Sequence, residues 1–337
     1  MKTIFIVDDN DVNLLSAEDA LSDIYRVYTL PSAIDMFAFL ENIVPDMILL
    51  DIEMPVMNGF EALERLKSDK RFADLSVIFL SSRKDTSAEV RGFELGGIDF
   101  IHKPFTKPIL LNRIKTHLEI DAIIHEQTSE LRALRNSTVS ALARVVENRD
   151  VFTGHHIERT TTYIEILLKA MLKRGMYLNE IETWDLDAVI LASRLHDVGK
   201  VTISDLILNK PGRLTPEEFE NMKTHTTEGE RIIDEIIVES GYQELLHHAK
   251  IFAGYHHERF DGTGYPHGTK GDGIPLQGRV MAIVDVYDAL ISERPYKMPF
   301  PHDKALDIII DSKGTHFDPK IVDVFLEVSD LFDKVEP

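Results

Sequence analysis

The residues with the clearest chemical potential in this sequence are His196 and Asp197, which stand side by side behind the apolar run 188–195. Imidazole and carboxylate groups are both ligands for first-row transition metals. Neighbouring residues on a helix point roughly 100° apart, so the two reach one metal only if other segments supply further ligands. Taken alone, the pair is more typical of a helix cap or a surface pair than of a metal site.

Further candidate ligands recur in the second half of the chain, each placed before a helix or near a helix end. They are His155, His156, His225, His256, His257 and Asp285. Asp285 lies in a mostly apolar helical run, 280–291, where a carboxylate carries a heavy desolvation cost unless it is paired or coordinated. Asp288 follows one turn later on the same face. A lone histidine is usually a hydrogen-bonded core or surface residue, but the whole set predicts a metal site between helices.

The elements that must position these ligands are almost all helical. The expected helices span 137–149, 155–174, 183–195, 215–222, 226–239, 243–253, 276–292, 302–311 and 318–328. The glycine-rich stretch 262–273 must be a loop. These segments predict an all-α helical bundle for the second part of the chain.

Residues 1–120 have a different pattern, in which short apolar runs alternate with helical segments. The expected strands are 4–7, 25–30, 47–50, 77–80 and 98–101, and the expected helices are 12–22, 32–43, 59–68, 86–95 and 107–119. Continuously apolar strands that alternate with helices predict a parallel sheet covered on both faces, an α/β doubly wound (flavodoxin-like) fold.

Polar residues follow the expected strands, at the edge where ligands of such sheets bind. They are Asp8, Asp9, Asp51, Ser81 and Lys103. Three carboxylates held together repel one another unless a cation joins them, and oxygen ligands select a hard ion such as Mg²⁺. The lysine can pair with a carboxylate or with a phosphoryl group attached to one.

A long amphipathic helix is expected over residues 106–148, with a break near 127–129. It contains no glycine, and Pro108 stands near its start. Its apolar stripe between two domains predicts a dimer seam, the alternative being that it packs on its own domains. We expect a homodimer.

The composition is that of an ordinary globular protein, with 44% hydrophobic and 28% charged residues. No run approaches the roughly 18 apolar residues of a membrane span. The absence of cysteine excludes disulfides and thiol catalysis. A net charge of -20, with both parts acidic, argues against a nucleic-acid-binding domain. Together with the lack of a signal-peptide pattern, these features predict a cytoplasmic protein without membrane or nucleic-acid partners.

Residues 1–120 resemble the receiver domain of bacterial two-component response regulators. The matching motifs are Val7-Asp8-Asp9, Leu50-Asp51, Met54-Pro55, Met57-Asn58-Gly59, Leu80-Ser81 and Lys103-Pro104-Phe105. The resemblance implies that Asp51 accepts a phosphoryl group from a histidine kinase. It also implies that Asp8, Asp9, Asp51 and the Glu53 carbonyl hold Mg²⁺. Ser81 and Lys103 would contact the phosphoryl group, and Phe100 would be the aromatic switch residue.

Residues 137–330, joined by a linker at 121–136, resemble the HD-GYP subgroup of the HD phosphohydrolases. The matching motifs include Asn148-Arg149-Asp150, Thr153-Gly154-His155-His156, His196-Asp197-Val198-Gly199-Lys200, His256-His257-Glu258, Asp261-Gly262-Thr263-Gly264-Tyr265-Pro266, Asp285-Val286-Tyr287-Asp288 and Arg294-Pro295-Tyr296-Lys297. The resemblance implies hydrolysis of cyclic di-GMP to pGpG, and in some members on to GMP.

The same resemblance implies two divalent metal ions bridged by Asp197. One ion would be held by His156, His196 and Asp285, and the other by His225, His256 and His257. His155 is the weaker rival of His156. Iron or manganese is favoured by the family, although the ligand set also suits nickel or zinc.

The remaining implied roles concern the substrate. Lys200 would act in catalysis with Asp197 by offsetting charge on the scissile phosphate. The substrate-binding residues would be Asp150, Lys200, Tyr265, Pro266, Asp288, Arg294 and Lys297. Some family members carry a glutamate for a third metal where this chain has Phe152, so two ions are expected. The alternative function is a catalytically weak receptor or scaffold that binds a diguanylate cyclase (GGDEF) protein through the Gly264-Tyr265-Pro266 loop.

Overall fold

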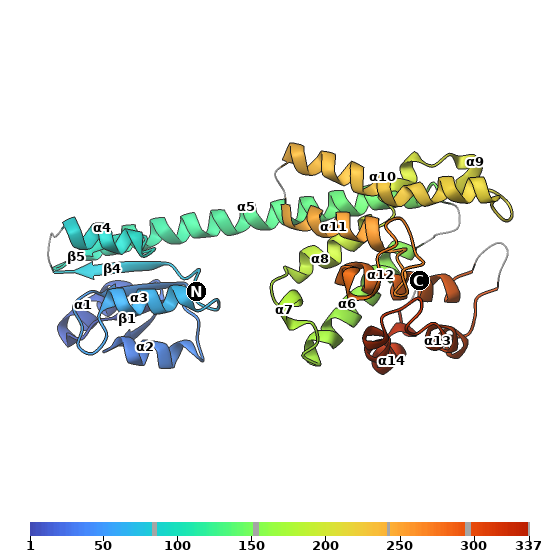
Figure 1. The fold of residues 1–337 in the computed structure, drawn as a ribbon. Helices are drawn as coiled ribbons and strands as arrows, with labels where there is room; N and C mark the ends of the chain where they lie inside the picture. The colour runs from blue at the N-terminus through green and yellow to red at the C-terminus, as the bar shows by residue number, and fades with distance from the viewer. Residues whose placement is uncertain (83–85, 151–154, 241–242, 294–297, 336–337) are drawn as a thin grey trace. The chain divides into compact units, whose positions relative to one another are not determined.

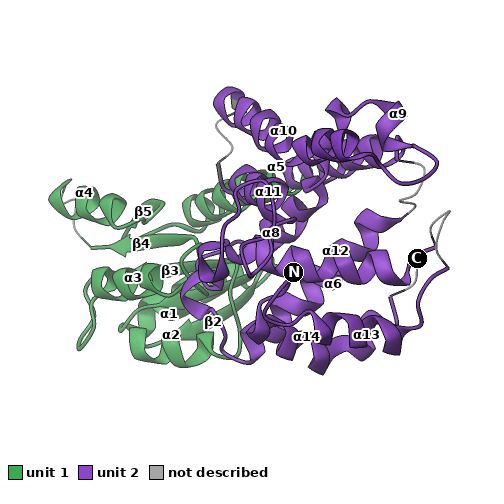
Figure 2. Cartoon of the chain, turned by 45° about the vertical axis from the view of Figure 1, so that its right-hand side comes forward, with its two compact units in different colours: residues 1–130 green, residues 131–337 purple. Residues whose placement is uncertain are grey.

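The computed structural model describes residues 1–82, 86–150, 155–240, 243–293 and 298–335. The chain divides into two compact units, residues 1–130 and residues 131–337 (Figure 2). Within the described ranges, every helix is too short or too polar to cross a membrane.

The first unit contains a five-stranded parallel sheet with strand order β2-β1-β3-β4-β5. Its strands are β1 (Thr3–Val7), β2 (Arg26–Leu30), β3 (Met47–Asp51), β4 (Val77–Ser81) and β5 (Asp99–His102). Its helices are α1 (Asp11–Leu21), α2 (Ala33–Leu40), α3 (Gly59–Ser68), α4 (Thr86–Glu94) and the start of α5 (Lys107–Glu147). This is the predicted doubly wound fold.

Successive residues of each strand point to opposite faces of the sheet and therefore enter two separate cores. Phe5 and Val7 pack with α2 and α3 on one face. Ile4 and Ile6 pack with α1 and the first turns of α5 on the other. Burial on both faces explains the unbroken apolar runs of β1, β3 and β4, whereas the edge strand β2 is partly exposed and contains Arg26 and Thr29.

Helix α5 runs without interruption from Lys107 to Glu147, as Figure 1 shows. The predicted break near 127–129 is therefore wrong. Ser and Thr in that stretch lower helix propensity only slightly, and the helix lacks an internal glycine or a later proline.

The regular secondary structure of the second unit's described residues is helical, as predicted, apart from one isolated β-bridge between Lys313 and Phe317. After the end of α5 come α6 (His156–Lys173), α7 (Leu178–Ile181), α8 (Leu186–Ala192), α9 (Asp205–Leu208), α10 (Pro216–Ser240), α11 (Gln243–Tyr255), α12 (Leu276–Ile291), α13 (His302–Asp311) and α14 (Pro319–Phe332). Short 3₁₀ helices are η1 (Ser193–Leu195), η2 (Val198–Thr202) and η3 (Gly271–Gly273). Helix α12 contacts both α6 and α11 in one common core.

Two local predictions differ from the structure. The helix expected to reach Leu195 ends at Ala192 and continues as η1, so His196 and Asp197 lie between two 3₁₀ turns rather than on a helix end. The two helices expected at 215–222 and 226–239 are the single helix α10, which carries His225 in its middle. His225 is therefore not near a helix end.

Candidate active site

Two clusters of metal-ligating side chains lie in the second unit, and each draws on separate segments of the chain. The first comprises His156 at the start of α6, His196 between η1 and η2, and Asp285 in α12. One ligand atom from each lies within 4.8 Å of the others. Asp285 is half-buried rather than buried, and its Oδ1 lies 3.6 Å from Nε2 of His156.

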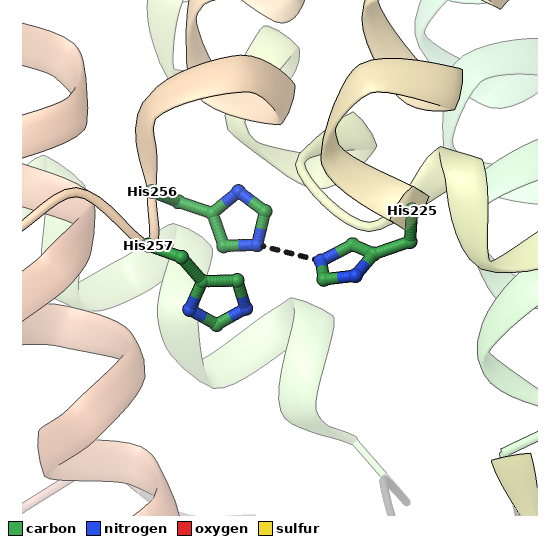
Figure 3. A group of neighbouring side chains, drawn as sticks. All are labelled: His225, His256 and His257. Carbon is green, nitrogen blue, oxygen red and sulfur yellow. Dashed lines mark hydrogen bonds between the residues drawn. The ribbon is translucent and has the colours of Figure 1, made fainter. Parts of the chain in front are cut away.

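The second cluster consists of three histidines, shown in Figure 3. His225 comes from α10, whereas His256 and His257 directly follow α11. Their ligand atoms also lie within 4.8 Å of one another. These two sets are the groupings implied by the family resemblance, and their role as metal ligands stays a prediction.

Asp197 lies between the two clusters and turns one carboxylate oxygen toward each. Its Oδ2 is 3.4 Å from Nε2 of His196. Its Oδ1 is 3.5 Å from Nε2 of His225 and 3.7 Å from Nε2 of His256. A carboxylate in this position can bridge two cations.

The hydrogen bonds behind the histidines fix which ring nitrogen carries the proton. Nδ1 of His196 lies 2.8 Å from the Ser193 carbonyl, and Nδ1 of His225 lies 2.7 Å from the Met222 carbonyl. Nδ1 of His256 is 2.9 Å from the Phe252 carbonyl. A carbonyl only accepts, so each Nδ1 carries the proton and, in a neutral ring, Nε2 presents a bare lone pair.

These lone pairs face one another across short distances. Nε2 of His225 and Nε2 of His256 are 3.2 Å apart, the contact dashed in Figure 3. Nε2 of His156 and Nε2 of His196 are 3.3 Å apart. The pKa of His225 and that of His256 are both lowered, so their facing nitrogens are unprotonated and repel at this distance unless a cation joins them. The donor set therefore fits divalent metal ions, with the second-layer hydrogen bonds typical of metal-ligating histidines.

The electrostatics of the two clusters keep most of the imidazoles neutral. Burial lowers the pKa of His256 to about 3, aided by the neighbouring His196 and His225. Burial likewise lowers the pKa of His225 and of His257. Burial also acts to lower the pKa of His196, but the charges of Asp197 and Asp285 and the hydrogen bonds to Asp197 and the Ser193 carbonyl together raise it. Neutral imidazole is the form that binds metals.

Asp288 is paired with other side chains of the protein, and its predicted substrate contact stays a prediction. Its carboxylate is 2% exposed. Oδ2 lies 2.8 Å from Nδ1 of His156, and the Arg159 guanidinium donates to both oxygens at 2.6 and 2.9 Å. Asp288 thus orients the candidate ligand His156, and the Arg159 guanidinium balances the negative charge of Asp288. The i, i+3 spacing from Asp285 placed it on the right face but could not reveal these partners.

Lys200 lies beside the bridging carboxylate. Its Nζ is 2.8 Å from Oδ2 of Asp197 and 3.1 Å from Oδ2 of Asp150. Burial favours the neutral amine, but Asp197 and Asp150 outweigh it and raise the pKa of Lys200, so the ammonium is retained. A small cavity reaches this point and is lined in part by His156, Asp197 and Lys200.

The glycine-rich loop is built around Glu258, which the sequence-based reasoning gave no role. Its buried carboxylate accepts hydrogen bonds from three successive backbone N–H groups of the loop, those of His267, Gly268 and Thr269. This places the Tyr265 ring 4.8 Å from the ring of His257. Pro266 is half-buried in the same loop.

Tyr265 also lies beside two residues of α10 that carried no prediction. Its ring meets the ring of Phe219 edge to face at 6.3 Å, and the Lys223 ammonium lies 5.7 Å from its centroid. The signal available in the sequence was their position on the helix of His225, six residues before it for Phe219 and two residues before it for Lys223.

The other predicted residues of this site divide into two groups. His155 is exposed, takes a left-handed backbone conformation (φ 59°) and belongs to neither cluster. Phe152, Arg294 and Lys297 lie outside the described residues.

The receiver site gathers at the carboxyl edge of the sheet in the first unit. Ligand atoms of Asp8, Asp9 and Asp51 lie within 4.8 Å of one another, a donor set that fits Mg²⁺. Nζ of Lys103 is 2.6 Å from Asp8 and 2.7 Å from Asp51. Burial raises the pKa of Asp51, against the hydrogen bond from Lys103.

Three further receiver residues were predicted from the sequence. Ser81 is buried at the end of β4, whereas the Glu53 side chain is exposed. The Phe100 ring is buried and stacks on Phe79 at 5.2 Å. It also packs on Gly92, where an added Cβ would lie 2.3 Å from the ring.

Comparisons with known proteins agree with this arrangement. Residues 129–321 match the family model described as HD domain, and residues 4–115 match that described as response regulator receiver domain. A probable cyclic di-GMP phosphodiesterase of Vibrio cholerae is 38% identical over 96% of this chain and 77% of its own length. The cyclic di-GMP phosphodiesterase response regulator RpfG of Xanthomonas campestris is 33% identical over 96% of this chain and 86% of its own.

A third relative matches only the second part of the chain. The 3′3′-cGAMP-specific phosphodiesterase 2 of Vibrio cholerae is 39% identical over 60% of this chain and 36% of its own length. Together with the two full-length relatives and the two family models, the geometry leads to one conclusion. The chain belongs to the response regulators in which a receiver domain is joined to an HD domain.

Proposed function

We propose that this protein is a phosphodiesterase that hydrolyses cyclic di-GMP to pGpG under the control of its receiver domain. The observation that carries the proposal is the position of Asp197, which turns one oxygen to each of two clusters of metal-ligating side chains. The names of the full-length relatives supply the substrate.

Two divalent metal ions would be held by the two clusters, with Asp197 shared between them. His156, His196 and Asp285 would hold one, and His225, His256 and His257 the other. When bound, such a pair supplies an activated water and Lewis acidity at the phosphate oxygens. The family resemblance favours iron or manganese.

The side chains of this protein add orientation and charge. Asp197 and Asp150 hold the Lys200 ammonium beside the bridging position, where it can offset negative charge developing on the phosphate. Asp288 and Arg159 hold His156 in the orientation that directs Nε2 to its cluster. Tyr265, Pro266, Arg294 and Lys297 would contact the nucleotide.

The product is proposed to be pGpG rather than GMP. Phe152 stands where a third-metal glutamate is found in some family members, and its phenyl ring cannot coordinate a metal. Two ions suffice for cleavage of one phosphodiester bond.

The receiver site would regulate this activity. Asp51 would accept a phosphoryl group from a histidine kinase, with Mg²⁺ on Asp8, Asp9, Asp51 and the Glu53 carbonyl. Ser81 and Lys103 would contact the phosphoryl oxygens, and Phe100 would be the switch residue.

The test is an assay of the metal-loaded, full-length protein with cyclic di-GMP and, separately, 3′3′-cGAMP, with products resolved by chromatography. We expect cyclic di-GMP to be converted to pGpG, and the substitution Asp197→Ala to abolish turnover while circular dichroism stays unchanged. Asp234→Ala, which removes an exposed carboxylate of α10 paired with Lys250, is the control and should retain full turnover.

Each other outcome contradicts part of the proposal. Undiminished turnover by the Asp197→Ala variant would contradict the assignment of the catalytic centre to the residues around Asp197. Preferential cleavage of 3′3′-cGAMP would show that this nucleotide, rather than cyclic di-GMP, is the substrate. Tight binding of cyclic di-GMP without turnover would favour the receptor or scaffold function that engages a diguanylate cyclase.

A further inference from the structure

Arg149, in the turn that follows α5, contacts the segment that carries Lys200. Its Nη1 donates to the carbonyl oxygen of Val201 at 2.6 Å and to that of Lys200 at 3.4 Å. Its Nη2 donates to the carbonyl oxygen of Ile203 at 3.1 Å and to Oδ1 of Asp205 at 2.7 Å. One guanidinium therefore donates to three carbonyl groups in and just after η2, of which that of Lys200 also accepts the backbone N–H of Ile203 at 3.1 Å.

The segment η2 also packs closely against α10. An added Cβ at Gly199 would lie 1.9 Å from the carbonyl oxygen of His225 and 2.5 Å from the backbone nitrogen of Gly229. Only glycine permits this approach. The backbone of Lys200 is thus held between the helix that carries a candidate ligand and the guanidinium of Arg149.

Arg149 is itself fixed in place. The Asn209 side-chain amide donates to its carbonyl oxygen at 2.8 Å. The preceding turn is anchored as well, since Oε1 of Glu147 accepts the backbone N–H of Ile157, next to His156, at 3.2 Å. The end of α5 is therefore tied both to the start of α6 and to η2.

We propose that Arg149 is a positioning residue that sets the place of the Lys200 ammonium beside Asp197, an inference that rests on the proposed phosphodiesterase function. A planar guanidinium can reach three carbonyl groups at once, whereas an ammonium is a single point donor. Removal of Arg149 frees η2 on one side, so Lys200 moves out of line with the phosphate. The clusters keep their ligands, and metal binding is retained.

The test is a double-mutant cycle in the full-length, metal-loaded protein with Arg149→Ala, Lys200→Ala and the double variant. We expect Arg149→Ala to lower kcat about 10- to 100-fold with KM changed less than about threefold. The Lys200→Ala variant is expected to turn over slowly, so its rate is measured with enzyme in excess over substrate. In this background, Arg149→Ala should change the rate less than about threefold.

Controls separate this role from a structural one. Arg174→Ala removes a surface arginine paired with Glu327 and should leave kcat unchanged. Asp205→Ala removes only the exposed carboxylate partner and should stay within about threefold of wild type, because the carbonyl contacts persist. If Arg149→Ala loses metal or helical content, Arg149→Lys takes its place and should still lower kcat.

Two results would overturn the inference while leaving the proposed function intact. One is full kcat in Arg149→Lys or Arg149→Ala. The other is a rate loss in the double variant that equals the product of the losses in the two single variants, which would show that Arg149 acts independently of Lys200. Absence of turnover in the wild-type protein would instead contradict the proposed function.

Discussion

Asp288 is a buried carboxylate that we expect to control the proposed metal site without binding a metal itself. It is 2% exposed and accepts from both His156 and Arg159. Asp288→Asn keeps the size of the side chain but removes the charge that polarises the imidazole. We expect the affinity for one of the two ions to fall about 10- to 100-fold, since second-layer partners typically contribute that much.

Competition with a chelator, followed by metal analysis, checks this expectation. The ion on the three-histidine cluster should be held as in wild type. Asp307→Asn changes an exposed carboxylate of α13 and is the matched control. Equal weakening of both ions in Asp288→Asn would contradict a role specific to His156.

The buried histidines predict how the metal-free protein responds to acid. Because burial lowers the pKa of His225, His256 and His257 below their usual 6.5, the folded chain keeps them neutral while the unfolded chain takes up protons below that pH. The free energy of unfolding therefore falls as pH decreases below about 6.5, by up to about 1.4 kcal/mol per pH unit for each such histidine. His196, whose pKa is raised, contributes in the opposite direction.

Urea unfolding of chelator-treated protein between pH 7.5 and 5 measures this dependence. Trp184, the only tryptophan, lies in the second unit and reports on its unfolding. His256→Asn should flatten the pH dependence, whereas His125→Asn, at an exposed position of α5, should not. A wild-type stability that is constant from pH 7 to 5 would contradict the expected neutral histidines.

At the scale of elements, short-range patterns of apolar and polar residues predicted the secondary-structure elements that depend mainly on neighbouring residues. Strands β1, β3 and β4 of the first unit carry unbroken apolar runs that end at polar residues, so their positions and the gathering of Asp8 and Asp51 were predictable. Helix α10 was not predicted as one element, because Thr224, Thr226 and Thr227 disfavour helix around His225. Packing of that turn against Gly199 outweighs the propensity.

The contacts that could not be predicted join residues far apart in the sequence. Arg159 meets Asp288 across 129 positions, and Arg149 meets Val201 across 52. Spacing within a helix gives the face on which a side chain lies, but not which distant segment covers that face. The supporting residues of the site therefore emerged only from the fold.

Helix α5 carries an exposed apolar stripe with the 3-4 spacing of a coiled coil. Its members are Ile120, Ile124, Leu131, Leu134 and Val145. We expect two copies of the chain to pair along it. Changing both Leu131 and Leu134 to Glu should convert the dimer to a monomer in sedimentation equilibrium, whereas Ser129→Glu, also exposed, should not. A wild-type monomer, or a double variant that remains dimeric, would contradict this pairing.

At the scale of the whole molecule, α5 is the covalent path from the receiver to the phosphodiesterase site. It begins four residues after Lys103 and ends at Glu147, next to Arg149. A continuous helix transmits displacement, but each glycine weakens it by about 1 kcal/mol.

We therefore expect beryllofluoride with Mg²⁺ to change kcat about fivefold or more in wild type, the lower range of allosteric coupling. Asp51→Asn should remove the response, and so should three glycines inserted after Gln127, with basal turnover retained in both. A response that survives the insertion would mean that the signal does not travel through α5.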